Sequence, residues 1–358
     1  MKKHGELKNI LMLAGLYIST VIGAGFASGQ EILSFFVVYG KKSAPGLVLV
    51  SIIFALCGSC VMYRVYRSKL NNFGEYMQHI AGKKTAAAVE LCTVLFMFAG
   101  FSSMAAGSGA LMQNYPDWHY IYGVLIMIAL CSLVFLFDLK GILAVNAILA
   151  PVLCIGLITL GISAFLSHDA PVFASDIITW VGSGTLIKNW LVSAIIYSAY
   201  NMLTTVVVLA DTRSLIHRGR SAVGAGVVGG GVLGIIALII WAAIGLYYGK
   251  TDLGEIPLLA IVSRQGRLLE HMYSAILMVA MFTTAVSFGY GFLSRLKDIL
   301  GYRSNSLVLI LGLITIPVAL LGFSGIVQSL YTLFGYLGIP LVVLILRDGV
   351  RMARERRR

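Results

Sequence analysis

The sequence predicts an all-α integral membrane protein with ten transmembrane helices, and two observations support that prediction. First, 59% of the 358 residues are hydrophobic and only 12% are charged, whereas soluble domains carry about 25% charged residues. Second, continuous apolar runs recur along the chain, and each approaches the roughly 20 residues that a helix needs to cross a bilayer. Such runs are unlike the short, alternating strands of a membrane β-barrel.

Ten runs meet this length criterion, and no loop between them is long enough for a soluble domain, so we expect one transmembrane domain over 1–358. The runs lie at about 8–38, 44–66, 86–114, 119–137, 141–166, 189–210, 221–248, 268–294, 305–323 and 325–346. The first run is too long for the apolar core of a signal peptide and is expected to remain in the mature protein.

Positive charge is distributed unevenly along the chain, which carries a net charge of +12. With ten spans and a cytoplasmic N-terminus, all but six of the 27 Lys and Arg residues fall on the cytoplasmic side. The six on the outer side are Lys41, Lys42, Lys188, Lys250, Arg264 and Arg267. This division follows the positive-inside rule and predicts that both termini are cytoplasmic. The basic end RMARERRR (351–358) is therefore interpreted as an anchor on membrane lipid, with no nucleic acid as partner.

The first span contains a stretch, STVIGAGFASGQE (19–31), that is poorly suited to a continuous helix. Glycines in a span often only permit close helix packing, which is our interpretation of the run GAGVVGGGVLG (224–234) in the seventh span. At Gly23-Ala24-Gly25 the polar residues that follow favour unwinding instead. Unwinding would expose backbone N–H groups at the start of an outer half-helix, where a carboxylate binds well.

Ten spans divide into five plus five, and an odd number in each half predicts an inverted repeat of about 7–166 and 189–346. The sixth span would then correspond to the first, so both are expected to be discontinuous. Small and polar residues, Ser198-Ala199-Tyr200-Asn201, lie at the centre of the sixth span. No glycine accompanies them, so this second break is encoded less plainly than the first.

The eighth span contains a pair of hydroxyls, Thr283 and Thr284, just after Ala280. Threonines in membrane helices often bond back to their own carbonyls, and that explanation stays open. The alternative is a sodium site, because hard cations take oxygen ligands. The two hydroxyls and the Ala280 carbonyl would then face carbonyls released by the break in the first span.

Two more residues are candidates for a site within the bundle. Glu31, near the outer end of the first span, either reaches the interface and caps the outer half-helix, or acts as a gate or in proton coupling. Phe101, in the third span, belongs either to the core or to the wall of a substrate site, since such sites combine apolar walls with few polar groups.

The opening segment GLYISTVIGAGFASGQEI (15–32) resembles that of the YkvI-like permeases of bacteria, and the likeness extends over nearly the whole chain. More distantly, the chain is similar to the amino acid–polyamine–organocation superfamily, which has the LeuT fold. In that fold a five-plus-five inverted repeat surrounds a site formed by broken helices one and six. The resemblance implies a multi-pass transporter in the bacterial cytoplasmic membrane.

The same resemblance implies roles for particular residues. The Gly-x-Gly backbone that takes a substrate carboxylate falls on Gly23, Ala24 and Gly25. Further substrate contacts are implied around the helix-six break, at Tyr197, Ser198, Tyr200 and Asn201. In sodium-coupled members the cation lies between two helix-one carbonyls and an Ala-x-x-[Ser/Thr]-[Ser/Thr] element. These ligands correspond here to Ser19 and Ile22 and to Ala280, Thr283 and Thr284.

These features lead us to expect a secondary active transporter for an amino acid or a related small zwitterion, with sodium as coupling ion and no cofactor. Two alternatives stay open. One is a proton-coupled or uncoupled permease for amines or other organic solutes, and the other is a transporter-fold receptor that binds without flux. The sequence has no Gly-x-x-x-x-Gly-Lys-[Ser/Thr] and no His-Glu-x-x-His motif, so we expect neither an enzyme nor an ATP-driven pump.

Overall fold

The computed structural model describes residues 2–136, 143–166, 187–300 and 305–355. Within these ranges all regular secondary structure is helical, which confirms the predicted all-α class. The sequence also predicts two short amphipathic elements, at 171–188 and 255–266, and the first lies almost entirely outside the described residues. The second is present as a short helix in front of the eighth predicted span.

The elements follow the order of the predicted spans. The first half contains α1 (Lys2–Val21), α2 (Ala24–Ser28), α3 (Gln30–Phe35), η1 (Val37–Ser43), α4 (Ala44–Ser68), α5 (Phe73–Gln113), α6 (Tyr120–Leu136) and α7 (Leu143–Leu166). The second half contains α8 (Trp190–Ala210), η4 (Asp211–Leu215), α9 (Gly219–Tyr247), α10 (Pro257–Val262), η5 (Ser263–Gln265), α11 (Arg267–Leu300), α12 (Asn305–Ala319), α13 (Phe323–Ile326), η6 (Val327–Tyr331) and α14 (Thr332–Glu355).

Six stretches of the described chain are helical, long and apolar enough to cross a membrane. They are Val37–Ser68, Phe73–Gln113, Trp190–Leu215, Gly219–Tyr247, Arg267–Lys297 and Phe323–Glu355. Three shorter apolar helices, Tyr120–Leu136, Pro151–Ala164 and Ser306–Ala319, fall at the fourth, fifth and ninth predicted spans. The first predicted span is divided among α1, α2 and α3. Six crossings are thus supported directly by helix length, and the full count of ten stays a prediction.

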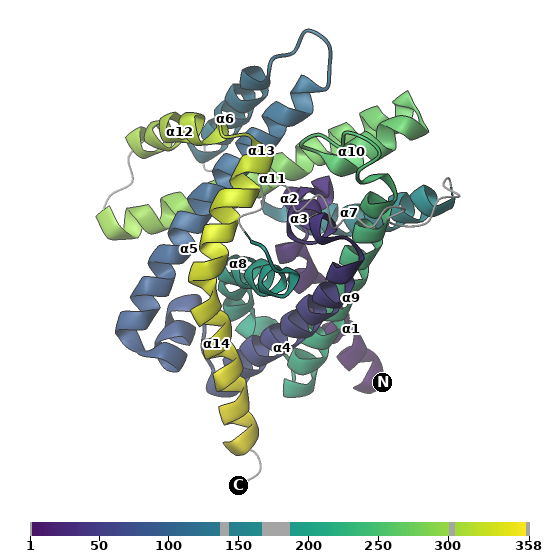
Figure 1. Ribbon diagram of the computed structural model, residues 1–358. Coiled ribbons are helices and arrows are strands. Elements are labelled where there is room, and N and C mark those ends of the chain that lie inside the picture. The colour runs from purple at the N-terminus through teal and green to yellow at the C-terminus, as the bar shows by residue number, and fades with distance from the viewer. Residues whose placement is uncertain (1, 137–142, 167–186, 301–304, 356–358) are drawn as a thin grey trace.

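The broken first segment lies inside the bundle (Figure 1). Around it, α4 packs along α9, α8 packs along α14, and α5 packs along α11. The two chain ends lie at the same end of the molecule (Figure 1). This placement is compatible with an even number of crossings.

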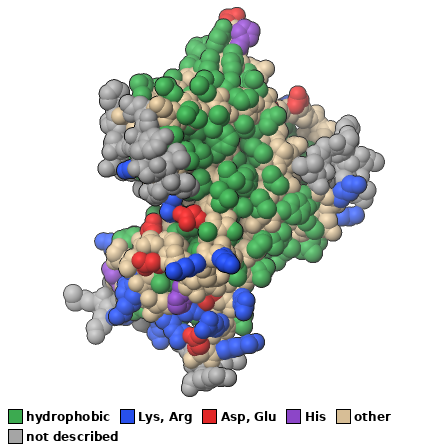
Figure 2. Space-filling model, turned by 90° about the vertical axis from the view of Figure 1, so that its left-hand side faces the viewer, with side chains coloured by type: hydrophobic (Ala, Val, Ile, Leu, Met, Phe, Trp, Pro, Cys, Tyr) green, Lys and Arg blue, Asp and Glu red, His purple; other side chains and the backbone are tan. Residues whose placement is uncertain are grey.

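The outer surface of the bundle is strongly apolar. Figure 2 shows hydrophobic side chains covering most of the visible face, while Lys and Arg gather at the lower end, where both termini lie. Leu268 is 75% exposed and Leu313 is 68% exposed. Single exposed apolar residues are ordinary in soluble proteins, but a continuous apolar surface indicates contact with lipid.

The glycine run in the seventh predicted span packs closely, as the sequence analysis proposed. On α9, Gly226, Gly230 and Gly234 face Ser59, Ala55 and Ser51 of α4, and a Cβ at any of the three would overlap the α4 residue opposite. The Ser51 hydroxyl donates to the Gly230 carbonyl at 3.0 Å. The two backbones therefore approach closely because three glycines repeat at every fourth position.

Candidate functional site

The first segment breaks where the sequence predicted. α1 ends at Val21, and Gly23 is extended, with φ −106° and ψ −171°, before α2 begins. A second interruption follows at Gly29, whose φ of 80° lies in the left-handed region that favours glycine. A Cβ at Gly29 would also meet Leu258 and Ile244. Both the conformation and the space around Gly29 therefore require glycine.

The break removes backbone groups from the helical hydrogen-bond pattern. The Gly23 N–H donates to the Val21 carbonyl at 2.9 Å rather than to the Ser19 carbonyl four residues back. The Tyr273 hydroxyl of α11 donates to the Ala27 carbonyl of α2, which ties the broken segment to α11. The Ser19 carbonyl, which the sequence analysis assigned to a cation, is thus released from α1.

The structure brings the eighth predicted span to this break. A Cβ at Gly23 would lie 3.5 Å from both Oγ1 and Cγ2 of Thr284. Thr284 is half-buried, and its hydroxyl has no hydrogen-bond partner among the described residues. Two segments about 260 residues apart in the chain therefore meet at the position where the sequence analysis expected them to meet.

Two of the other expected cation ligands, the Thr283 hydroxyl and the Ala280 carbonyl, are joined to each other by a local hydrogen bond. The buried Thr283 hydroxyl donates to the Ala280 carbonyl at 3.2 Å. The Ser19 hydroxyl donates to the Leu16 carbonyl at 2.7 Å. Of the two oxygen atoms of Ser19, it is therefore the carbonyl oxygen that the break leaves available. The described residues contain no group of three or more His, Cys, Asp or Glu side chains that could hold a metal ion. Hydroxyls and released carbonyls are the oxygen ligands that a hard cation such as sodium would need.

The predicted break in the sixth span is wrong, because α8 runs without interruption from Trp190 to Ala210. The polar residues at its centre bond within the helix: Ser198 donates to the Ala194 carbonyl and Asn201 to the Tyr197 carbonyl, each at 2.9 Å. Such bonds satisfy polar side chains without unwinding the backbone. Symmetry with the first span suggested the break, but there is no glycine in α8 to permit it.

α8 nevertheless contributes directly to the centre of the bundle. The Tyr200 hydroxyl donates to Glu31 Oε2 at 2.7 Å. Glu31 belongs to α3 and is only 6% exposed, so its carboxylate neither reaches the surface nor caps an exposed helix end. A Cβ at Gly25 would overlap Glu31 Oε1, so the carboxylate lies directly over the backbone of the broken segment.

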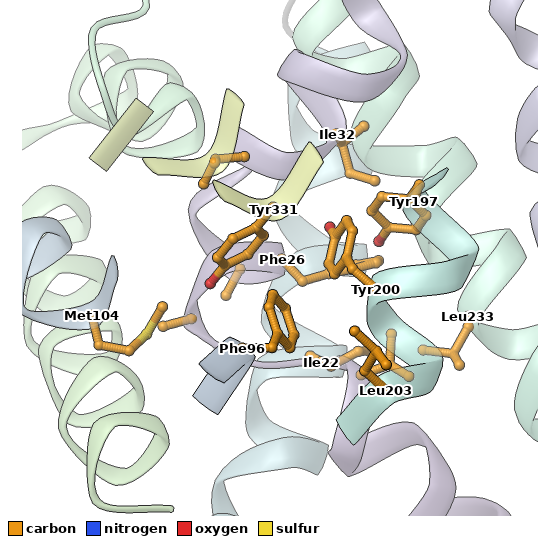
Figure 3. Close-up of a cluster of buried hydrophobic side chains, with 14 of the residues drawn as sticks. Ile22, Phe26, Ile32, Phe96, Met104, Tyr197, Tyr200, Leu203, Leu233 and Tyr331 are labelled. Carbon is orange, nitrogen blue, oxygen red and sulfur yellow. The ribbon is translucent and has the colours of Figure 1, made fainter. Parts of the chain in front are cut away.

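Aromatic side chains from four elements surround this pair. The Tyr200 ring lies 5.0 Å from Tyr331, 5.4 Å from Tyr197, 5.4 Å from Phe35 and 5.7 Å from Phe96, measured between ring centroids. Figure 3 shows Tyr197 and Tyr200 extending from α8, with Phe96 and Tyr331 approaching from other elements near Phe26 and Ile22. We call Phe35, Phe96, Tyr197, Tyr200 and Tyr331 the aromatic cluster.

The sequence predicts only part of this cluster, namely Tyr197 and Tyr200, but not Phe35, Phe96 or Tyr331. Phe101, which the sequence indicates as a candidate wall of the site, lies apart from the cluster and contacts Phe135 of α6, at 6.2 Å between ring centroids. An available signal was the proximity of Phe35 to Glu31, one helical turn away in the same segment.

The fold is that of known membrane transporters. The chain superposes on a manganese transporter of Eremococcus coleocola bound to an aromatic bis-isothiourea compound, with a TM-score of 0.60 and 15% identity over 93% of this chain and 77% of that one. MhsT in complex with L-phenylalanine gives a TM-score of 0.59 and 15% identity over 90% and 87% of the two chains. The inward-facing form of Mhp1 gives 0.56 and 15% over 94% and 75%. The chain is therefore a multi-pass membrane protein with the LeuT fold.

Sequence comparison identifies the family. The chain is 30% identical to YyaD of Bacillus subtilis (strain 168) over 333 residues, which cover 92% of this chain and 94% of YyaD. It is 26% identical to the membrane protein YkvI of the same organism over 335 residues, 93% of this chain and 94% of YkvI. The chain belongs to the family of YyaD and YkvI. No protein-family model matches it.

Proposed function

We propose that the protein is a secondary active transporter that carries a small amino compound, an amino acid or a related solute, together with sodium. One observation supports this proposal above the others: the first segment breaks at Gly23, and Thr284 of α11 lies against that break. Discontinuous helices mark substrate and ion sites in transporters, because they release backbone groups at mid-membrane depth.

The proposed mechanism uses the two halves of the fold. Sodium would bind between carbonyls of the first segment and hydroxyls of α11, and so stabilise one arrangement of the two. The substrate would bind beside the broken segment, between α3 and α8. A ligand shifts a conformational equilibrium only by its difference in affinity for the two conformations. Sodium and substrate would together bind the closed conformation more tightly than the outward-open one, and the closed conformation would then open inward.

We place both termini on the cytoplasmic side of a bacterial cytoplasmic membrane. The end of the bundle that carries both termini is also where Lys and Arg gather (Figures 1 and 2). A concentration of positive charge at one end is typical of the cytoplasmic side of a membrane protein.

The first prediction concerns sodium. Sodium chloride, compared with potassium chloride at equal ionic strength, should raise the Tm of the purified protein, since a ligand that binds the folded state stabilises it. Thr284→Ala removes one oxygen ligand and should raise the sodium concentration needed for half of this shift by about tenfold, which corresponds to about 1.4 kcal/mol. Thermal unfolding in detergent, followed by intrinsic fluorescence, measures both quantities.

Thr315→Ala is the matched control for this experiment. Thr315 is a buried threonine on α12 whose hydroxyl donates to the Leu311 carbonyl of its own helix at 2.7 Å. Its removal should lower Tm slightly and leave the sodium response unchanged. If Thr284→Ala responds to sodium as the wild-type protein does, Thr284 is not a sodium ligand.

A second candidate function, proton-coupled transport, is favoured by the burial of Glu31. Ionisable residues within a membrane protein often carry protons along transport pathways. In proteoliposomes without sodium, a pH gradient, acid outside, should then drive accumulation of a transported amine or amino acid. Accumulation that needs sodium and ignores the pH gradient would exclude this candidate.

A further inference from the structure

Glu31 lacks the partner that a buried carboxylate normally has. It forms no ion pair with any Lys, Arg or His in the described part of the chain, and Tyr200 is its only side-chain hydrogen-bond donor there. Buried charges are usually paired, because a carboxylate away from water is costly without compensation. One hydroxyl provides only part of that compensation.

The free side of the carboxylate faces the broken segment. Oε2 accepts from Tyr200, while Oε1 accepts no hydrogen bond from the described residues and lies over Gly25. The place beside Gly25, where a bound substrate's carboxylate would approach the backbone, is therefore occupied by a carboxylate of the protein itself. A second carboxylate there would be repelled, because like charges a few ångströms apart interact strongly in a poorly solvated site.

The aromatic cluster around Glu31 has the composition of a cation site. Five rings from α3, α5, α8 and η6 lie near one carboxylate, and the faces of aromatic rings attract ammonium groups. Ordinary core packing would account for the phenylalanines, but not for the polar atoms among the rings. The fully buried Tyr197 hydroxyl has no hydrogen-bond partner in the described part of the chain.

The backbone beside Tyr331 adds an independent observation. Val327–Tyr331 forms a π-helix, between the short α13 and the long α14. π-Helices are rare and frequently occur at functional sites. The π-turn brings Tyr331 to 5.0 Å from Tyr200 and 5.2 Å from Phe96. The rings thus contact one another in this conformation, and a ligand would enter as Tyr331 and Tyr200 separate.

We propose that Glu31 and the aromatic cluster bind the ammonium group of the substrate, and that this substrate is an organic amine without a carboxylate next to its amino group. The inference rests on the proposed transport function and narrows its substrate class. Glu31 supplies the negative charge, the rings supply the apolar and cation-attracting wall, and Tyr200 holds the carboxylate when no amine is bound. An amino acid would bring a second carboxylate to the place that Glu31 already fills.

The test compares amines with the amino acids that differ from them by one carboxylate. The probes are phenethylamine and phenylalanine, isobutylamine and valine, cadaverine and lysine, and agmatine and arginine, each measured with sodium and with potassium. Binding is followed by the Tm of the purified protein, and transport by uptake of the labelled compound into proteoliposomes. We expect at least one amine to raise Tm and to be taken up, while its amino acid partner requires at least tenfold higher concentration.

Two variants locate the binding. Glu31→Gln keeps the hydrogen bond from Tyr200 but removes the charge, and should raise the amine concentration for half-maximal shift at least tenfold. Phe96→Leu removes one ring and should weaken amine binding severalfold, whereas Phe96→Tyr keeps the ring and should restore it. Phe98→Leu is the matched control, because Phe98 contacts Phe292 and lies outside the cluster. Each variant's Tm without ligand shows whether it is folded.

The outcomes separate this inference from the proposed function. If amino acids bind and are transported while their amines are not, the substrate class is wrong and the transport function stands. If amines bind equally well to Glu31→Gln and to the wild-type protein, the assignment of Glu31 is wrong. If none of the eight compounds binds or crosses the membrane under any ion condition, both the inference and the proposed function fail.

Discussion

Replacing Gly230 by leucine should prevent α4 and α9 from packing and should destabilise the protein more than a typical core substitution. A Cβ at this position would lie 2.6 Å from the Ala55 Cα and would also overlap the Ala55 backbone nitrogen. Overpacking a core usually costs about 1–3 kcal/mol, and the cost is limited when a side chain can move aside. Here the obstacle is backbone, so we expect a loss of at least about 3 kcal/mol, at the upper end of that range.

The neighbouring Gly231 provides the control. It lies on the same helix, and a Cβ there would meet no atom within 4 Å. Gly231→Leu should keep or raise stability, because leucine favours the helix over glycine by up to about 1 kcal/mol. Unfolding in detergent and the fraction of monodisperse protein after size-exclusion chromatography measure both variants. If Gly230→Leu and Gly231→Leu behave alike, close approach of α4 and α9 does not determine stability.

The sequence could predict the break in the first segment because its cause is local. Gly23 and Gly29 lie in the middle of an apolar run with polar residues around them, and a helix in lipid has few reasons to contain that combination. The meeting of this break with Thr284 was anticipated from the oxygen ligands that a hard cation needs and from the family resemblance. No local property of Thr284 indicates which distant segment it contacts.

The sixth span shows where reasoning from symmetry fails. The two halves of an inverted repeat share a topology, but each helix responds to its own residues. In α8 the Ser198 and Asn201 side chains bond to carbonyls one turn back, and no glycine releases the backbone. The same two polar residues would look identical in sequence whether they unwound the helix or bonded along it.

The aromatic cluster was only partly predictable because α5 carries almost no periodic signal. Every residue from Ala99 to Leu111 is buried, so apolar spacing does not reveal which face of the helix is turned to the site. Phe96 and Phe101 are five residues apart, which separates them by about 140° around a helix of 3.6 residues per turn. One faces Tyr200 and the other faces Phe135. Choosing between them requires the packing of distant helices.

Asp348→Ala should cost about 3–5 kcal/mol, because it leaves a buried arginine without its partner. Arg64 of α4 donates to Asp348 of α14 through Nε at 2.8 Å and through Nη2 at 2.5 Å, and both side chains are at most 7% exposed. This two-point pair joins two long helices near the end of the bundle that carries the termini. The pair contributes to the free energy of unfolding less through net attraction between the two charges than through the penalty of leaving one buried charge unpaired when the other is removed.

The double variant Arg64→Met with Asp348→Leu distinguishes these two contributions. It removes both charges and keeps most of the packing volume, so it should recover most of the stability that Asp348→Ala loses. Arg351→Ala is the control for an exposed pair: Arg351 bonds to Glu355 at 3.1 Å but is 76% exposed, and its loss should cost less than about 1 kcal/mol. Unfolding free energies in detergent provide the measurement. A double variant as unstable as Asp348→Ala would mean that the ion pair itself, rather than the avoidance of an unpaired charge, holds α4 to α14.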